Sequence, residues 1–300
     1  MIPDIGLDPE LLQRILGILF PIVAIVVVGF LYGLRHNPEM AVANRINMDI
    51  FVPSLILGAM AAKHFEPQRY IGLACGAALL LLVCGLLAWL LARWLRIDWR
   101  TFVPPMMFNN SANIGIPLAV LTWGEDALPA AIVLYTVSNV MHFSIGLHML
   151  DRNAHLLALW RNPTLIAAVS GITIAALGIT LWEPLVTALQ LMGNVAVPLL
   201  LFALGVRMKH VRFNDLGAPL VGALCRPVLG MALAWGMATM LELNERDSAM
   251  LLVFGALPPA VMNFLFAERY NQSPERVAAI VLIANLAALI MMPLALMLVL

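Results

Sequence analysis

Three asparagines in an apolar stretch are the residues of this chain best suited to binding chemistry. Asn109, Asn110 and Asn113 lie in the segment 102–120, which belongs to an apolar run long enough to cross a bilayer. A side-chain amide in a membrane span is costly unless it is hydrogen-bonded, so it either joins helices or binds a ligand. Because an asparagine amide both donates and accepts hydrogen bonds, it suits a carboxylate or another polar substituent. The sequence therefore indicates a substrate-binding site here, with bonds between helices as the alternative.

Prolines and a glycine in the same segment predict that its helix is interrupted. Pro105 and Pro117 have no amide hydrogen for a helical bond, and Pro104, which precedes another proline, is driven away from the α region. An unpaired backbone group in hydrocarbon is so costly that a break is tolerated only where protein buries it or a cavity adjoins it. We therefore predict a broken helix, with Gly115 permitting close approach of a second backbone. A proline kink whose free groups bond to neighbouring helices is the alternative.

The composition places this segment in an all-α polytopic membrane protein. The chain has 300 residues, of which 62% are hydrophobic and only 11% are charged, and its mean hydropathy is +0.94. Its 17 basic and 17 acidic residues cancel, so no excess charge points to nucleic acid as a partner. Cys75, Cys84 and Cys225 lie in apolar stretches without the spacing of a metal site or a disulfide framework. We therefore expect the lipid bilayer around the protein, and neither a metal nor a cofactor.

Apolar stretches of about 20 residues, the length that crosses a bilayer, recur along the whole chain. Ten transmembrane helices are expected, with approximate limits 11–34, 44–62, 69–92, 100–122, 127–149, 162–182, 186–206, 216–240, 248–267 and 276–299. The first run is too long for the core of a signal peptide and follows acidic residues, so we expect it to remain as a span. The short linkers leave no room for a soluble domain, which places the function inside the bundle.

The distribution of basic residues favours an orientation with both termini outside. Lysine and arginine concentrate in cytoplasmic loops. In this orientation, twelve of the 17 basic residues fall in inner loops and four fall outside, while Arg226 lies within a span. We expect a multi-pass protein of the cell inner membrane.

Two echoes along the chain indicate an internal repeat. The sequence VPSLIL at 52–57 in span two resembles VPLLLF at 197–202 in span seven. The sequence VPP at 103–105, which precedes Asn109, resembles LPP at 257–259, which precedes Asn263. Chance matching in a leucine-rich sequence is the alternative to a true repeat.

The echoes divide the chain into two five-helix repeats, 1–152 and 153–300. Because each half has an odd number of spans, the second is inverted relative to the first. We predict that broken helices four and nine cross near the membrane midplane, with Pro258 and Pro259 setting the second break.

Such a crossing would present partial charges of both signs to a ligand. Half-helix N-termini attract anions and C-terminal carbonyls attract cations, so a carboxylate is a natural ligand. Asn263, which the repeat relates to Asn109, and Ser54 join the candidate binding residues. Arg226 lies roughly 15 Å into span eight, at 1.5 Å per residue, where it could neutralise an anion or pair with Asp49. Snorkelling to the inner interface is the alternative for Arg226.

Four further polar residues are candidates for ion coupling, namely Asp49, Asn139, His142 and Asn285. His142 could relay protons near neutral pH, although a membrane histidine bonded to a neighbour is the commoner case. Apart from Asp49, no carboxylate lies well inside a span. The sequence therefore leaves open whether H⁺ or Na⁺ is coupled.

Catalysis is not expected of this chain. It contains no zinc-binding HExxH helix, phosphate-binding loop or nucleophile elbow, and no pair of deep carboxylates. A membrane receptor without transport activity is a further alternative. That alternative gives no reason for inverted broken helices, and the large extramembrane segments typical of it are missing.

Two motifs resemble those of a known family. The sequence NSANIGIPL at 110–118 resembles the fourth-span signature of the auxin efflux carrier family, N-x-G-x-x-G-x-P-L, and AERY at 267–270 is similar to that family's ending of span nine. The resemblance implies a ten-span carrier with two inverted repeats, crossed spans four and nine, and both termini outside. It also implies that Asn110 reaches the substrate carboxylate, that Pro117 lies at the crossover, and that the carrier forms a homodimer.

Departures from the family pattern bear on the substrate. Ala112 stands where the signature has glycine, and Asn263 stands where plant members have proline. The long cytoplasmic loop of many plant members is missing, as in bacterial carriers of malonate and other organic acids. We therefore expect a bacterial secondary transporter that moves small organic anions by alternating access, rather than an auxin carrier. The alternative is a sodium-coupled carrier of the bile-acid symporter type, which shares the ten-span plan.

Overall fold

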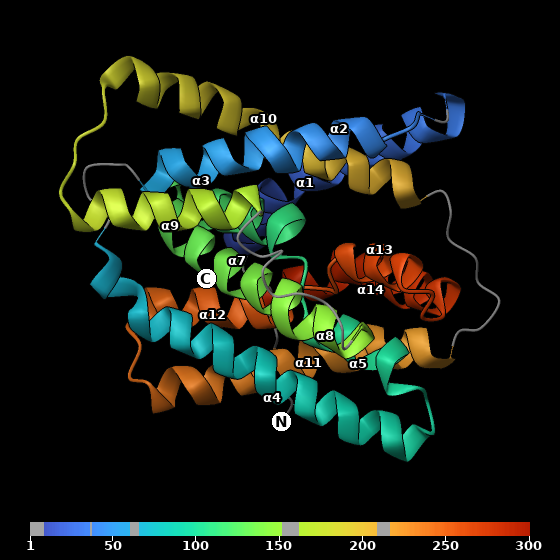
Figure 1. The fold of residues 1–300 in the computed structure, drawn as a ribbon. Helices are drawn as coiled ribbons and strands as arrows, with labels where there is room; N and C mark the ends of the chain where they lie inside the picture. Colours follow the sequence, from blue (N-terminus) through green and yellow to red (C-terminus); the bar gives the residue numbers. More distant parts are fainter. Residues whose placement is uncertain (1–8, 37, 61–65, 152–161, 209–216) are drawn as a thin grey trace.

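The protein is a bundle of helices. The computed structural model describes residues 9–36, 38–60, 66–151, 162–208 and 217–300 (Figure 1). Within these ranges the one β-type pairing is an isolated antiparallel bridge between Asn109 and Pro259. This all-helical architecture is that of a polytopic membrane protein.

Six helical segments among the described residues are long and apolar enough to cross a membrane. They contain α1 (Pro9–His36), α4 (Ile71–Leu95), α7 (Leu128–Met141) with α8 (Leu147–Leu150), α10 (Glu183–Met208), α11 (Gly217–Met240) and α14 (Pro274–Met297). Large apolar side chains on their outer faces are exposed, among them Phe20, Trp94 and Trp235. This exposure fits helices that face hydrocarbon rather than water.

Shorter or interrupted helices lie within the remaining predicted spans. These are α2 (Ala41–Ile46) and α3 (Val52–Met60), α5 (Trp99–Met107) and α6 (Ile116–Trp123), α9 (Pro163–Ala176), and α12 (Glu245–Ala256) and α13 (Met262–Arg269). π-helical turns join α2 to α3 (Asn47–Phe51), precede α6 (Ser111–Gly115) and join α7 to α8 (His142–Gly146). Helices thus lie within all of the predicted spans. The boundary predicted between the two halves, at 152 and 153, lies outside the described residues.

The predicted limit of span six was wrong. We expected a helix to residue 182, but α9 ends at Ala176. Gly178 takes a left-handed φ of 64°, and the amide of Ile179 donates to the carbonyl of Ile174 at 3.0 Å. This closure of the last turn is typical of a helix that ends at a glycine. The apolar residues after Gly178 concealed the end of the helix from a hydropathy count.

The first interrupted helix breaks later than its prolines suggest. α5 begins after Asp98, whose carboxylate accepts a hydrogen bond from the amide of Arg100, and it continues through Pro104 and Pro105 to Met107. Its interruption comprises residues 108–110. The prediction of a break at Pro104 and Pro105 therefore does not match the structure. The carbonyl of Pro104 still accepts the amide of Phe108 at 2.9 Å, so the helix survives for another turn.

Pro117 also lies within helix rather than in the interruption. It is the second residue of α6, and the π-helical turn Ser111–Gly115 leads into it without a gap.

The second interrupted helix breaks at its prolines. α12 ends at Ala256, and Leu257, with a ψ of 141°, leads the chain out of the helix into Pro258 and Pro259. α13 begins at Met262.

Asn244 caps the N-terminus of α12. Its side-chain oxygen accepts the amide of Asp247 at 2.9 Å, and its side-chain nitrogen donates to the Asp247 carboxylate at 2.7 Å. We expect Asn244→Ala to lower the free energy of unfolding by about 0.5–2 kcal/mol, because orphan amides of the first turn lose their acceptor. Thermal unfolding of the purified protein measures this loss. Asn244→Ser, which keeps a capping oxygen, should retain most of the stability, and equal losses in the two variants would contradict the capping role.

The helices form two groups that face each other (Figure 1). One group contains α1, α2, α3, α9 and α10, and the other contains α4, α5, α11, α12, α13 and α14, with α7 between them. Within the first group α1 and α10 pack backbone to backbone, because Gly29 lies against Phe202 and Gly205 lies against Val26. α5, α12 and α13, which adjoin the breaks, belong to the second group, whereas α6 packs against α1 and α7.

Candidate functional site

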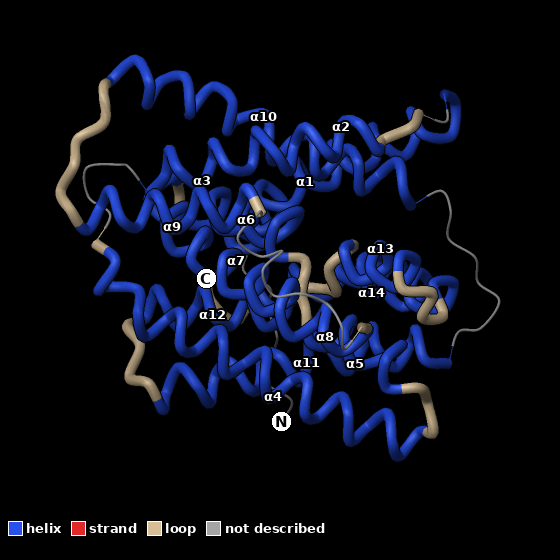
Figure 2. Tube along the Cα trace, in the orientation of Figure 1, coloured by secondary structure: helices blue, strands red, loops and turns tan. Residues whose placement is uncertain are grey.

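The two interruptions bind each other through their backbones. The amide of Asn110 donates to the carbonyl of Pro258 at 2.7 Å, and the amide of Ala260 donates to the carbonyl of Phe108 at 2.9 Å. These bonds form the antiparallel bridge between Asn109 and Pro259. Figure 2 shows the two loops side by side in the middle of the bundle. Backbone groups that each break removes from its own helix are thus satisfied by the other break.

Two asparagines make reciprocal bonds across the bridge. The side-chain nitrogen of Asn109 donates to the carbonyl of Phe254 at 2.8 Å, at the end of α12. The side-chain nitrogen of Asn263 donates to the carbonyl of Phe108 at 3.1 Å, at the end of α5. Asn109, in the first interruption, therefore caps the end of α12. Asn263, in α13, caps the end of α5.

Asn285 of α14 links the bridge to Asn110. Its side-chain nitrogen donates to the carbonyls of Pro259 at 2.9 Å and Val281 at 2.7 Å. Its side-chain oxygen accepts the side-chain nitrogen of Asn110 at 2.8 Å. These bonds orient the Asn110 amide, which is buried at 2% exposure.

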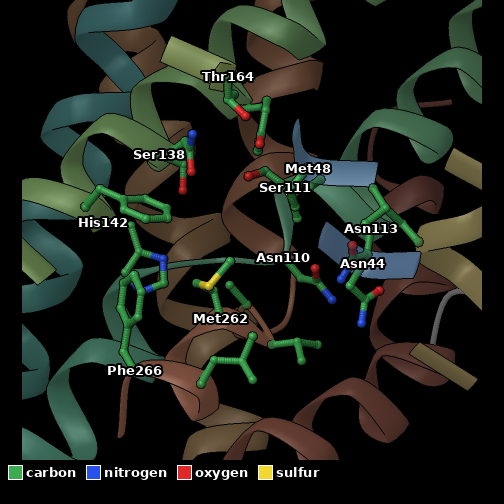
Figure 3. A pocket seen from close by; sticks show the side chains of 18 of the residues that line it. Asn44, Met48, Asn110, Ser111, Asn113, Ser138, His142, Thr164, Met262 and Phe266 are labelled. Carbon is green, nitrogen blue, oxygen red and sulfur yellow. The ribbon is translucent and has the colours of Figure 1, made fainter. Parts of the chain in front are cut away.

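A cavity of about 670 Å³ lies beside the bridge, between the two groups of helices (Figure 3). Residues 109–113 and 260–262 line it from the interrupted helices, while Thr164 of α9 and Leu200 and Leu204 of α10 line it from the first group. Figure 3 shows the amides of Asn44, Asn110 and Asn113 toward one side and the rings of His142 and Phe266 toward the other. A solute in this cavity would contact both groups of helices at once.

All three π-helical turns named above contribute to the cavity wall. Met48 and Asp49 come from the first, Ser111 to Asn113 from the second, and His142 and Phe143 from the third. A π-helical turn widens the helix locally, and such turns are frequent at functional sites. Their coincidence around one cavity supports a binding role for it.

The aromatic side of the cavity is a continuous stack. His142 lies parallel to Phe108, with ring centroids 4.3 Å apart, and edge-on to Phe266 at 5.0 Å. Phe143 also meets Phe266 edge-on at 5.1 Å. Phe108 belongs to the first interruption, so this stack connects the break to the cavity wall.

Charged residues line the cavity where it reaches the helix ends. Arg207 lies in the last turn of α10, Arg269 lies in the last turn of α13, and Asp151 directly follows α8. Asp49 lies deeper, in the π-helical turn between α2 and α3. The cavity therefore runs from the bridge to the end of the bundle that carries Arg207 and Arg269.

The structure brings together about half of the residues predicted for the site. Asn109, Asn110, Asn113, Asp49, Asn139 and His142 line the cavity. Gly115, Ser54, Asn263, Asn285 and Arg226 are not among the residues that line it. Ser54 donates to the carbonyl of Ile50 at 2.7 Å within its own helix, as serines in helices commonly do.

Gly115 lies where the two interrupted helices approach closely. A Cβ atom placed on it would come within 2.9 Å of the Leu257 side chain. It lines a separate space of about 20 Å³ behind the bridge, together with residues of α7 and α12. Ser111 borders both this space and the large cavity.

Arg226 neither lines the cavity nor pairs with Asp49, the two roles predicted for it. It is 1% exposed, and its guanidinium donates to the carbonyl of Gly255 at 2.6 Å rather than meeting the cavity or Asp49. The sequence predicted how deep Arg226 lies within span eight. The direction of its side chain depends on which helices pack around α11.

Sequence reasoning missed the walls that α7, α9 and α10 supply. Tyr135, Ser138, Thr164, Ala203, Leu204 and Arg207 line the cavity although no motif marks them. Polar residues in otherwise apolar spans were the available signal for Ser138 and Thr164. Over the described residues, no group of three or more histidine, cysteine or acidic side chains could hold a metal ion.

A polar-ended cavity that lies between two groups of apolar helices, beside paired helix interruptions, is the arrangement of a membrane transport protein. Residues 153–296 match a family described as membrane transport protein. This match is consistent with a member of the auxin efflux carrier family, which the fourth-span and ninth-span motifs predicted. No curated protein sequence matches the chain.

Proposed function

We propose that this protein is a secondary active transporter that carries small organic anions across the inner membrane by alternating access. The observation that carries the proposal is the cavity beside the bridge, which both groups of helices line. A volume of about 670 Å³ accommodates a carboxylate with an organic body. Its aromatic side would contact that body, and its amide side would contact the carboxylate.

We assign the anion-binding side of the cavity to the helical segment that starts at Ser111. Residues 111–113 line the cavity in the first turn after the interruption. The first amides of a helix have no acceptor within the helix, and its N-terminus carries a partial positive charge. Asn110 and Asn113 add side-chain donors at the same place, so a carboxylate would find both charge and hydrogen bonds there.

The proposal includes ten spans in two inverted five-helix repeats. The reciprocal bonds of Asn109 and Asn263, which occupy matching places in the two halves, support this symmetry. With both termini outside, the end of the cavity that carries Arg207 and Arg269 faces the cytoplasm. The structure would then represent the inward-facing state, and the small space behind the bridge would widen in the outward-facing state.

Transport would require the second group of helices to move against the first. Pro53 in α3 and Pro198 in α10 lie in the first group and would shape the boundary of the moving part. Asp49, Asn139 and His142 line the cavity and are the proposed residues for coupling to H⁺ or Na⁺.

Thermal stability of the purified protein tests the substrate charge. The panel contains acetate, succinate, malonate and benzoate, with benzamide as the neutral match for benzoate, each with and without sodium. A ligand at 100 times its dissociation constant should stabilise the protein by about 2.7 kcal/mol. We expect at least one carboxylate to raise the unfolding temperature while benzamide does not, and proteoliposomes should take up the same carboxylate.

Stabilisation by neutral solutes or cations alone would overturn the anion assignment. Carboxylate uptake that depends strictly on sodium would favour the bile-acid symporter type of mechanism. Carboxylate binding without any flux in proteoliposomes would favour a receptor.

A further inference from the structure

The paired prolines of the second interruption remove two specific hydrogen bonds from α12. In an α-helix the amide of residue i+4 donates to the carbonyl of residue i. Continuation of α12 would therefore require Pro258 to donate to Phe254, and Pro259 to donate to Gly255. Neither proline has an amide hydrogen, so these two carbonyls need other donors.

Two side chains from distant segments supply those donors. The side-chain nitrogen of Asn109 donates to the carbonyl of Phe254 at 2.8 Å, and Nη1 of Arg226 donates to the carbonyl of Gly255 at 2.6 Å. The amide of Leu257 also reaches Phe254, at 3.4 Å, whereas Arg226 is the donor found for Gly255. The end of the α12 half-helix is thus capped by α11 and by the first interruption.

The surroundings of Arg226 hold it against this carbonyl. Gly230 of α11 and Gly255 of α12 lie backbone to backbone, and a Cβ atom on Gly230 would come within 2.6 Å of Nη1 of Arg226. The guanidinium occupies space that a side chain at Gly230 would otherwise fill. Carbonyls at a helix C-terminus carry partial negative charge, which favours a cation at this place.

Burying this cation is costly, since Nε and Nη2 of Arg226 are buried without a hydrogen-bond partner among the residues that the structure describes. A membrane arginine that neither snorkels nor pairs with a carboxylate needs another stabilising contact. Its contact with the end of α12 is that interaction. The bridge begins at Pro258, three residues after Gly255, so this contact lies directly before it.

We propose that Arg226 is a positioning residue of the transport site. Its guanidinium replaces the amide that Pro259 lacks and fixes the end of α12, so that Pro258 and Ala260 can bond to Asn110 and Phe108. This role rests on the proposed function only in that the bridge adjoins the substrate site. Arg226 acts on the substrate through the bridge and does not touch it.

Hydrogen–deuterium exchange of the full-length protein in lipid nanodiscs tests this role without any substrate. The amides to follow are those of Asn110 and Ala260, which form the bridge. Arg226→Met keeps the length and apolar stem but removes the donor and the charge. Arg226→Lys keeps the charge and one donor direction, and Val228→Met, at an exposed position of α11, is the matched control.

We expect Arg226→Met to speed exchange at Asn110 and Ala260 at least about tenfold, because the bridge opens locally more often. Exchange in α1 and α10 should stay within about twofold of the wild type. Arg226→Lys and Val228→Met should resemble the wild type throughout. If Arg226→Met does not fold, Arg226→Gln, which is uncharged and shorter, should give the same local increase.

Unchanged exchange at both bridge amides, or an equal increase in every helix, would overturn the positioning role. A uniform increase would mean that Arg226 contributes only to the general stability of the bundle. Because this measurement uses no anion, its outcome is independent of the carboxylate panel. If Arg226→Met speeds exchange at the bridge but no carboxylate binds, the substrate assignment fails and the role of Arg226 in the bridge stands.

Discussion

Replacing Asn110 by alanine should lower carboxylate uptake at least about tenfold while leaving the protein folded. The side chain lies in the cavity wall, where its amide would donate to the substrate. A hydrogen bond to a charged group is worth about 1.5–3 kcal/mol, and 1.4 kcal/mol corresponds to about a tenfold change in affinity. The measurement is uptake into proteoliposomes, together with the dissociation constant of the stabilising carboxylate.

The fold should tolerate this substitution for a specific reason. The backbone amide at position 110 still donates to the carbonyl of Pro258. Asn285 loses the side chain of Asn110 as a partner but keeps its bonds to the carbonyls of Pro259 and Val281. Thr164→Val is the control, because it removes another cavity-lining polar group, on α9, that has no proposed part in anion binding or ion coupling. We expect Thr164→Val to keep carboxylate affinity. Unchanged affinity in Asn110→Ala would remove that residue from the site.

Gly29→Ala should lower the free energy of unfolding by about 1–3 kcal/mol, the usual cost of overpacking. The added methyl group would collide with the carbonyl of Phe202, and backbone cannot move aside as a flexible side chain can. α1 and α10 would have to separate, which weakens the packing of the first group of helices. The measurement is the temperature at which half of the purified protein remains monodisperse after heating.

Gly17→Ala is the control on the same helix. A Cβ atom on Gly17 would meet nothing within 4 Å. Alanine is also the better helix former, by roughly 0.5–1 kcal/mol. We therefore expect Gly17→Ala to be neutral or slightly stabilising. Equal losses in the two variants would show that the close approach of α1 and α10 does not limit stability.

The two groups of helices differ in how rigidly they are packed. The first group packs α1 against α10 through glycines, which favours a rigid unit. The second contains both interruptions, where backbone bonds run between segments far apart in sequence. A few hydrogen bonds at the bridge can therefore determine the shape of the cavity without unfolding a complete helix.

The sequence by itself determined the class of protein and the general place of the site. Hydropathy, proline and asparagine content are local properties, so they predicted apolar helices, the break at Pro258 and Pro259, and a polar site near Asn110 and Asn113. The family motifs are local in the same sense, and the match of residues 153–296 to a membrane transport family is consistent with that assignment. The internal repeat is also a pattern of local sequence, and it related Asn263 to Asn109.

The tertiary structure decided which of these groups meet. Pro104 and Pro105 remain inside α5 because the amide of Phe108 still finds a helical acceptor, so the first break falls at the residues that can bond to the second. Asn263 and Arg226 donate to backbone carbonyls rather than to the cavity, because each break leaves carbonyls that need donors. Thr164 and Leu204 became cavity walls through the packing of α9 and α10. These contacts join residues that are distant in sequence, so they follow from how the helices pack and not from any local pattern.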